Sequence, residues 1–336
     1  YRGLLYGAAL LHDIGHGPLS HTGEEMFGLR HEAWSARVIR HHPEIRDCLE
    51  SHESGTAEAV ANLLEHGRSP HPLIKHLVSS QLDCDRLDYL LRDSYSTGTR
   101  YGQLDLDRIL GALTLAPDGD MAIHPKGLMA VEHYLVVRNL MYRSVYNHRL
   151  NVVCNWLLER LIFTARQLGP EQVWADGVMA SWLWQPEMLS LEDFLANDDQ
   201  RTGYHLQRWQ SEAPAALAEL SGRFLDRRLL KATAVAHLPR ADQLQLLATA
   251  RRLADRQGHD PELCCGLRHQ QLRGYHPYRG GLRLWDGQQL QALEKASPLV
   301  SSLATPAATS WLIHPREISS ELREEMDVEW PRSAAG

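Results

Sequence analysis

The sequence predicts a mainly α-helical fold with one small β-hairpin and, toward the C-terminus, a peripheral lobe of mixed α and β structure. Three observations predict this fold class. Apolar residues recur at intervals of three and four through most of the first half. The turn sequence Pro117-Asp118-Gly119 separates two short segments of alternating polarity. Beyond residue 170 the helical segments are shorter, and strand-like pieces follow between residues 267 and 287.

Glycine and proline separate the first helical segments. Residues 3–13 predict a buried helix that stops before Gly15 and Gly17-Pro18, because proline lacks an amide donor and glycine disfavours helix interiors. Surface helices should follow over residues 31–42, 55–67 and 71–80. A further helix over residues 82–98 should turn one side of leucines toward the core, namely Leu82, Leu87, Leu90 and Leu91.

The remaining elements are expected in the order hairpin, long helix, short helices and strands. They are a hairpin over residues 112–127, one long helix over residues 128–169, shorter helices over residues 170–230 and strand pieces over residues 267–287, divided at Gly280-Gly281. The last residues, 331–336, should fray. We therefore expect a helical core of residues 1–169 and a C-terminal lobe of residues 170–336.

Composition excludes several classes of protein. Hydrophobic residues make up 43% and charged residues 23% of the 336 residues, which is typical of a globular protein. A net charge of −7 without a basic block argues against duplex nucleic acid as a partner. No apolar run approaches the roughly 20 residues that span a bilayer. The five cysteines show no metal-binding or disulfide spacing, so we expect reduced thiols and a cytoplasmic protein.

The stretch LLHDIGHGPLSH, residues 10–21, carries the strongest chemical signal. His12 and Asp13 offer an imidazole nitrogen and a carboxylate oxygen at the end of a helix, and such mixed ligands suit a divalent metal. A His-Asp pair by itself is more often a pair of surface residues. Here it is followed by two glycines, a proline and two further histidines, His16 and His21.

These residues resemble the signature HDxGHGPxSH of the HD-domain phosphohydrolases. Within that superfamily the chain is similar to the branch of the sterile-alpha-motif and HD domain deoxynucleotide triphosphohydrolase and its bacterial relatives. Three further blocks carry the resemblance: RHEAWS at residues 30–35, DCDRLDYLLRDSYSTG at residues 83–98 and VVRNLMYRSVYNHR at residues 136–149. Their order and spacing agree over about residues 1–165, and the likeness is weaker beyond residue 170.

The resemblance implies a divalent metal ion, either iron, manganese, magnesium or zinc. His12, Asp13 and Asp85 would be its ligands, and the family's fourth ligand, a histidine, is expected upstream of Tyr1. The alternative for Asp85 is a solvated acid on a helix surface. We favour the ligand, because three more aspartates crowd the same segment.

The resemblance also implies catalytic histidines. His21 would protonate the leaving group with the help of Glu24, and His16 and His31 would lie near the phosphates. One histidine alone is more often a hydrogen-bonded interior residue, but three beside a metal pair favour catalysis. For Glu24, a capping role and an orienting role are equally open.

The implied substrate is a deoxynucleoside triphosphate. The residues in question could instead be core tyrosines and surface arginines. Tyr142 stands where the best-known relative has a histidine, so its contact with the base side or the phosphate side is left open. The implied contacts are Tyr89, Asp93, Tyr142 and Tyr146 around the nucleoside, and Arg138 and Arg149 at the phosphates.

The predicted function is therefore a metal-dependent hydrolase that converts a deoxynucleoside triphosphate into deoxynucleoside and triphosphate. The resemblance further implies a homo-oligomer, either a tetramer or a dimer. Two alternatives remain. One is an HD phosphohydrolase that acts on a monophosphate, a cyclic dinucleotide or single-stranded nucleic acid. The other is a non-catalytic regulator that binds nucleotides.

Overall fold

The computed structural model describes residues 1–272, 274–277 and 281–329, and it is mainly helical, as predicted. The chain forms two compact units that interleave along the sequence. The first consists of Tyr1–His16, Arg30–His148 and Leu272–Ala307, and the second of Gly17–Leu29, Arg149–Gln271 and Ala308–Gly336. The predicted division into domains at residue 169 stays a prediction.

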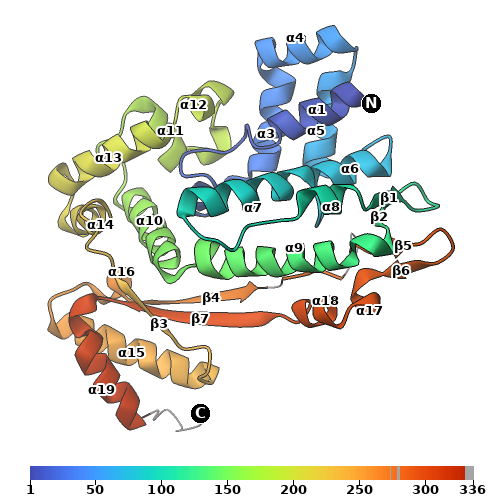
Figure 1. Ribbon diagram of the computed structural model, residues 1–336. Coiled ribbons are helices and arrows are strands. Elements are labelled where there is room, and N and C mark those ends of the chain that lie inside the picture. The colour runs from blue at the N-terminus through green and yellow to red at the C-terminus, as the bar shows by residue number, and fades with distance from the viewer. Residues whose placement is uncertain (273, 278–280, 330–336) are drawn as a thin grey trace. The chain divides into compact units, whose positions relative to one another are not determined.

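Five helices open the first unit: α1 (Arg2–Leu11), α3 (His31–His41), α4 (Pro43–His52), α5 (Thr56–His66) and α6 (Pro72–Val78). Helix α5 packs against α3 and α1 (Figure 1). The surface helices predicted in this region are confirmed. Gly67 ends α5 with φ +62°, a left-handed conformation that glycine adopts without strain.

Helix α1 is not the buried helix that the sequence predicts. Only Leu4 and Ala8 are buried, whereas the side chains of Tyr6 and Leu10 are 67% and 82% exposed. An apolar run alone does not show how many faces of a helix find partners, and α1 packs on one side.

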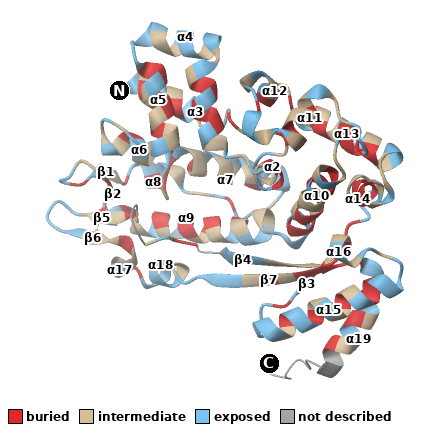
Figure 2. Ribbon diagram, turned by 180° about the vertical axis from the view of Figure 1, so that it is seen from behind, coloured by how far each residue is buried: buried red, intermediate tan, exposed pale blue. Residues whose placement is uncertain are grey.

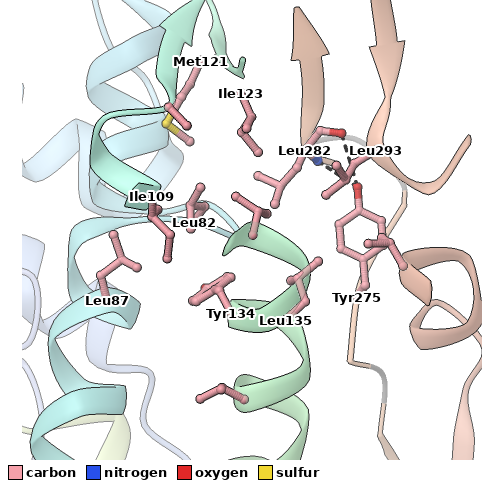
Figure 3. Close-up of a cluster of buried hydrophobic side chains, with 14 of the residues drawn as sticks. Leu82, Leu87, Ile109, Met121, Ile123, Tyr134, Leu135, Tyr275, Leu282 and Leu293 are labelled. Atoms are coloured by element: carbon pink, nitrogen blue, oxygen red, sulfur yellow. Dashed lines mark hydrogen bonds between the residues drawn. The ribbon is translucent and has the colours of Figure 1, made fainter. Parts of the chain in front are cut away.

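The larger core of the first unit lies between α7 (Cys84–Thr97), α8 (Leu106–Leu110) and α9 (Leu128–Met141). Leu82, Leu87 and Leu90 are buried in it, as the leucine pattern predicts, whereas Leu91, predicted to join them, is only partly buried. Figure 3 shows Tyr275 reaching this core, where the Leu282 amide donates to its hydroxyl at 2.8 Å. The core therefore joins segments that are far apart in the sequence.

The first unit also contains a four-stranded sheet with the order β1-β2-β5-β6. The predicted hairpin is confirmed as β1 (Leu113–Leu115) and β2 (Met121–Ile123), which pair antiparallel. Strand β5 (Arg283–Trp285) pairs parallel to β2 and antiparallel to β6 (Leu290–Ala292). The 3-10 turn η1 (Pro125–Gly127) and the helices α17 (Leu293–Ala296) and α18 (Pro298–Leu303) complete the unit.

The prediction of a single long helix over residues 128–169 is wrong. Helix α9 ends at Met141, a π-helical turn η2 follows over Tyr142–Tyr146, and α10 begins at Arg149 and ends at Leu168. The backbone leaves the helical conformation at Asn147, with φ −104° and ψ 25°. Its amide makes the π-helical bond to the Tyr142 carbonyl at 2.8 Å, and its side-chain nitrogen donates to the same carbonyl at 3.0 Å. Apolar spacing continues through this break and cannot reveal it.

The second unit begins with α2 (His21–Phe27), which packs on α10. The predicted short helices are confirmed as α11 (Gly177–Trp184), η3 (Pro186–Met188), α12 (Leu191–Leu195), α13 (Asp199–Glu212) and α14 (Ala215–Leu225). Its sheet has the order β3-β7-β4. These strands are β3 (Lys231–Ala234), β4 (Gly266–Leu272) and β7 (Ala307–His314).

Further helices of this unit are α15 (Arg240–Arg256), α16 (Pro261–Cys264), η4 (Arg316–Ile318) and α19 (Ser319–Glu329). Figure 2 shows that α15 is buried on one side and exposed on the other. Strand pieces occur at the predicted place, whereas Gly280 and the predicted frayed end, residues 331–336, lie outside the described residues. Within the described residues, no helix combines the length and the apolar character that crossing a bilayer requires.

Candidate functional site

His12 lies where α1 ends, and its ring is held by the backbone of that helix. Nδ1 lies 3.0 Å from the Ala9 carbonyl, which can only accept, so Nδ1 carries the hydrogen. Nε2 then faces Oδ1 of Asp13 at 3.4 Å and Oδ1 of Asp85 at 3.5 Å. One nitrogen and two carboxylate oxygens of these residues lie within 4.8 Å of one another.

The turn that presents His12 and Asp13 is fastened to α3 by Ser35. This serine is fully buried. Its Oγ donates to the His12 carbonyl at 2.6 Å and accepts from the Gly15 amide at 2.9 Å. A Cβ on Gly15 would lie 2.2 Å from the His31 carbonyl and the Ser35 amide, which explains the glycine. The sequence analysis did not predict the role of Ser35, although a serine on the apolar side of a helix indicates a buried hydroxyl that needs hydrogen-bond partners.

The electrostatics of this cluster favour a cation. The contact with Asp85, with Asp13 adding to it, raises the pKa of His12 to about 9 in spite of burial. The same contact lowers the pKa of Asp85. Two carboxylates thus favour a positive charge at Nε2, which a divalent ion bound there would supply.

The donor set of the cluster fits a divalent metal ion. His12 Nε2 is buried and makes no hydrogen bond of good geometry among the described residues. Its contacts with the two carboxylates, at 3.4 and 3.5 Å, are ion-pair contacts rather than hydrogen bonds. An imidazole nitrogen with two carboxylate oxygens is a ligand set that several divalent metals accept.

His16 and His31 lie together in the first unit. Their rings stack with centroids 4.1 Å apart and an angle of 21° between the planes. Nε2 of His16 lies 3.7 Å from Oδ1 of Asp13, so the pair adjoins the cluster of His12, Asp13 and Asp85. This places two imidazoles next to a candidate cation site.

His21 and Glu24 belong to the second unit, in the first turn of α2. Nδ1 of His21 lies 3.0 Å from Oε2 of Glu24. The His21 side chain is 74% exposed, while that of Glu24 is 24% exposed. The carboxylate can therefore orient an imidazole that stays accessible to a ligand.

The predicted sugar-binding residues come together between α7 and the π turn. The Tyr146 hydroxyl donates to Oδ2 of Asp93 at 2.8 Å, and the hydroxyls of Tyr89 and Tyr142 lie 3.3 Å apart. The Tyr142 and Tyr146 rings meet edge to face with centroids 5.1 Å apart. Burial raises the pKa of Tyr89, and burial together with Asp93 raises that of Tyr146, so both hydroxyls stay neutral donors.

The two predicted arginines lie in different units. Arg138 on α9 is buried, with its guanidinium 5.4 Å from the centre of the Tyr142 ring, and its Nη1 has no partner among the described residues. Arg149 begins α10 and lines a cavity of about 320 Å³ with Lys231 and Arg316. Burial lowers the pKa of Lys231, and the neighbouring arginines lower it further.

Two family models match the chain. The model for the HD domain matches residues 2–93, and the model for the HD associated region matches residues 104–172. These matches contain the cluster of His12, Asp13 and Asp85 as well as Tyr89 of α7 and the two tyrosines of the π turn.

Several known proteins are similar in sequence. The uncharacterised protein YwfO of Bacillus subtilis is 35% identical over 231 residues, which are 68% of this chain and 53% of that protein. An uncharacterised protein of Methanocaldococcus jannaschii is 37% identical over 46% of this chain and 32% of its own length. The chain thus spans between a third and about half of these relatives. A Dictyostelium discoideum homolog of the deoxynucleoside triphosphate triphosphohydrolase SAMHD1 is 26% identical over 43% of this chain and 30% of its own length.

Two crystal structures share the fold. A phosphohydrolase of Bacteroides thetaiotaomicron superposes with a TM-score of 0.77 and 25% identity, covering 93% of this chain and 79% of its own. A hypothetical protein of Aquifex aeolicus gives a TM-score of 0.73 and 23% identity, covering 96% of this chain and 79% of its own. The second likeness, at this identity, is one of fold alone.

Proposed function

The chain belongs to the HD-domain phosphohydrolase superfamily, and from that premise we propose that it hydrolyses deoxynucleoside triphosphates to deoxynucleoside and triphosphate in one step. One observation carries the choice of substrate: the Tyr146 hydroxyl bonds to Asp93 at 2.8 Å, beside Tyr89 and in the same unit as the His12 cluster. A carboxylate with aromatic rings around it is suited to a sugar, whose hydroxyls donate and whose ring is apolar.

His12, Asp13 and Asp85 would hold the divalent metal, either iron, manganese, magnesium or zinc. A bound divalent ion neutralises phosphate oxygens and lowers the pKa of its bound water toward neutrality. Ser35 keeps the His12 backbone in place, and the Ala9 carbonyl keeps Nδ1 protonated, so that Nε2 is directed at the ion.

His21 would act as the general acid. Hydrolysis adds water to the α-phosphorus and breaks the bond to the 5′-oxygen, which leaves poorly as an alkoxide and needs a proton. Glu24 accepts a hydrogen bond from Nδ1 of His21, so the opposite nitrogen can deliver that proton. The stacked His16 and His31 would donate to phosphate oxygens.

The tyrosines and Asp93 would select the sugar. The Asp93 carboxylate accepts a hydrogen bond from the 3′-hydroxyl, and the Tyr146 ring fills the space that a 2′-hydroxyl would need. Tyr142, held near the Tyr89 hydroxyl, borders the same space. A site that crowds out one hydroxyl discriminates against the nucleotide that carries it.

Arg138 and Arg149 would contact the phosphates. The buried guanidinium of Arg138 keeps one nitrogen without a partner among the described residues, which suits a phosphate oxygen. Arg149 is supported by its basic surroundings, because Lys231 and Arg316 line the same cavity. Local positive charge of this kind is compatible with a net charge of −7.

We also propose that the protein works as a homo-oligomer, either a tetramer or a dimer, and in the cytoplasm. The family resemblance suggests the oligomer. The cysteines suggest the compartment, because all five are free.

Product analysis tests the proposed function. The protein is incubated with each deoxynucleoside triphosphate and Mn²⁺, and the products are separated by ion-exchange chromatography. Release of intact triphosphate together with deoxynucleoside is the expected result. Stepwise loss of single phosphates, or hydrolysis only of monophosphates or cyclic dinucleotides, would favour another phosphoester as substrate. Nucleotide binding without hydrolysis would favour a regulator.

A further inference from the structure

The two residues before His21 have a strained backbone. Leu19 has φ +63°, and Ser20 has φ +54° with ψ −129°. Residues with a Cβ rarely adopt positive φ, and such strain persists only where the surroundings enforce it. Among the described residues only Arg227 is a further non-glycine residue with positive φ. The strain is thus concentrated on the turn that leads into α2.

A single side chain from α13 holds this turn. The Ser20 amide donates to the Gly17 carbonyl at 3.2 Å, which closes a tight turn with Leu19 as its third residue. The Leu19 amide is then captured by Oδ1 of Asp199 at 2.7 Å, 180 residues later in the chain. Asp199 is the first residue of α13 and belongs to the same unit.

The other neighbours leave the turn little room. A Cβ on Gly17 would lie 2.6 Å from the Trp182 ring, and a Cβ on Gly23 would lie 2.0 Å from the Pro18 carbonyl. The Thr22 hydroxyl donates to Asn155 on α10 at 2.9 Å. These contacts fix both sides of the turn, whereas Asp199 supplies the acceptor for the Leu19 amide at its centre.

We propose that Asp199 is a positioning residue for His21. By accepting the Leu19 amide, its carboxylate keeps Leu19 and Ser20 in the strained conformation from which α2 starts at His21. The Ser20 carbonyl accepts the first helical hydrogen bond, from the Glu24 amide at 3.2 Å, so the geometry of Ser20 sets the direction of the helix that carries both His21 and Glu24. The proposal rests on the proposed function only in taking His21 as the acid.

Hydrogen exchange tests, without any substrate, whether Asp199 stabilises the turn. In Asp199→Ala the Leu19 amide loses its acceptor, so exchange in the peptide of residues 17–23 should become at least about tenfold faster. Asp199→Asn keeps an oxygen acceptor and should exchange like the wild type. Asp198→Ala is the matched control, because the neighbouring Asp198 caps α13 by accepting from the Arg201 amide at 2.8 Å and does not contact the turn.

Kinetics test the consequence for catalysis. A misplaced acid should lower kcat of Asp199→Ala about tenfold while KM changes by less than about twofold, because the loss falls on the transition state. The pH profile of kcat for Asp199→Ala should no longer show the titration of the general acid. Asp199→Asn should restore both kcat and its pH profile. In Asp199→Ala, a second change, Leu19→Gly, should recover part of the rate, since glycine adopts positive φ without a holding partner.

The outcomes separate this proposal from the proposed function. If the wild type releases no triphosphate, the proposed function fails, and hydrogen exchange still decides whether Asp199 holds the turn. Equal exchange in Asp199→Ala and Asp198→Ala would overturn the proposal. So would an Asp199→Asn variant as defective as the alanine variant, because a lost charge rather than a lost acceptor would then be the cause.

Discussion

Tyr146 and Asp93 are joined by a 2.8 Å hydrogen bond that links the π turn after α9 to the C-terminal half of α7. In a regular helix Tyr142 and Tyr146 would lie one above the other along one face. The π turn changes this spacing, so that their rings meet edge to face at 73° while Tyr146 reaches Asp93 and Tyr142 reaches Tyr89. π turns often occur at functional sites.

The first prediction concerns selection of the sugar. Tyr146→Ala should lower the preference for a deoxynucleotide over the matching ribonucleotide by at least about tenfold, because the ring no longer fills the 2′ position. Tyr146→Phe should keep most of the discrimination. The measurement is kcat/KM for each pair of nucleotides. Tyr95→Ala is the control, since Tyr95 lies on the same helix as Asp93 and is 90% exposed. An unchanged ratio in the alanine variant would remove Tyr146 from the sugar site.

The second prediction concerns the metal. Asp85→Ala should abolish hydrolysis and weaken Mn²⁺ binding by about a hundredfold or more, because one of two carboxylates is lost from a three-residue cluster. Isothermal titration with Mn²⁺ measures binding, and circular dichroism checks the fold. Asp88→Ala is the matched control, because Asp88 is exposed on the same helix and pairs with Arg92. Full Mn²⁺ affinity in Asp85→Ala would contradict the assignment.

The third prediction concerns Ser35. Ser35→Ala leaves the His12 carbonyl and the buried Gly15 amide without their partner, which should lower the free energy of unfolding by about 1–3 kcal/mol. Mn²⁺ affinity should fall as well, since the turn that carries His12 and Asp13 is loosened. Urea unfolding and titration with Mn²⁺ measure the two effects. Ser51→Ala, at an exposed serine of α4, should change neither; equal values for the two variants would refute the role of Ser35.

The local elements of this fold could be predicted because their signals are local. The Gly67 end of α5 and the Pro117-Asp118-Gly119 hairpin follow from neighbouring residues alone. The pairing of Ile123 with Leu284 could not be predicted, because no local sequence signal in either strand indicates a partner so far away in the sequence. The break after Met141 was missed for a different reason. The apolar spacing of α9 continues into α10, whereas the break depends on the non-helical backbone of Asn147 and on its side-chain bond to the Tyr142 carbonyl.

The candidate site shows the same limit. His12, Asp13 and Asp85 could be proposed from the motif, and their side chains do converge. Residues that act through the backbone could not, because a serine such as Ser35 or an exposed acid such as Asp199 has many ordinary uses. Their roles follow from which amide or carbonyl they reach, which depends on the packing of helices that are distant in the sequence.

The last prediction concerns pH and a histidine of the second unit. His314 on β7 is 1% exposed; its Nδ1 donates to the Pro315 carbonyl at 2.8 Å, and its Nε2 accepts from the Thr233 hydroxyl at 2.9 Å. Burial lowers the pKa of His314 to about 4, and Lys231 on β3 and Arg323 on α19 also disfavour its protonation. The folded protein therefore keeps this imidazole neutral where an unfolded chain, with a histidine pKa of about 6.5, already protonates it.

Because the pKa is lower in the folded state, the stabilising contribution is complete above about pH 6.5 and is lost as the pH falls from there toward 4. When the pH is lowered from 8 to 5, His314 should therefore reduce the free energy of unfolding by about 2 kcal/mol. Urea unfolding at both pH values measures the loss. His314→Gln cannot take up the proton, so its loss between the two pH values should be smaller than that of the wild type by this amount. His237→Gln, at an exposed histidine of the same unit, should leave the loss unchanged; if His314→Gln behaves in the same way, another group causes the acid sensitivity.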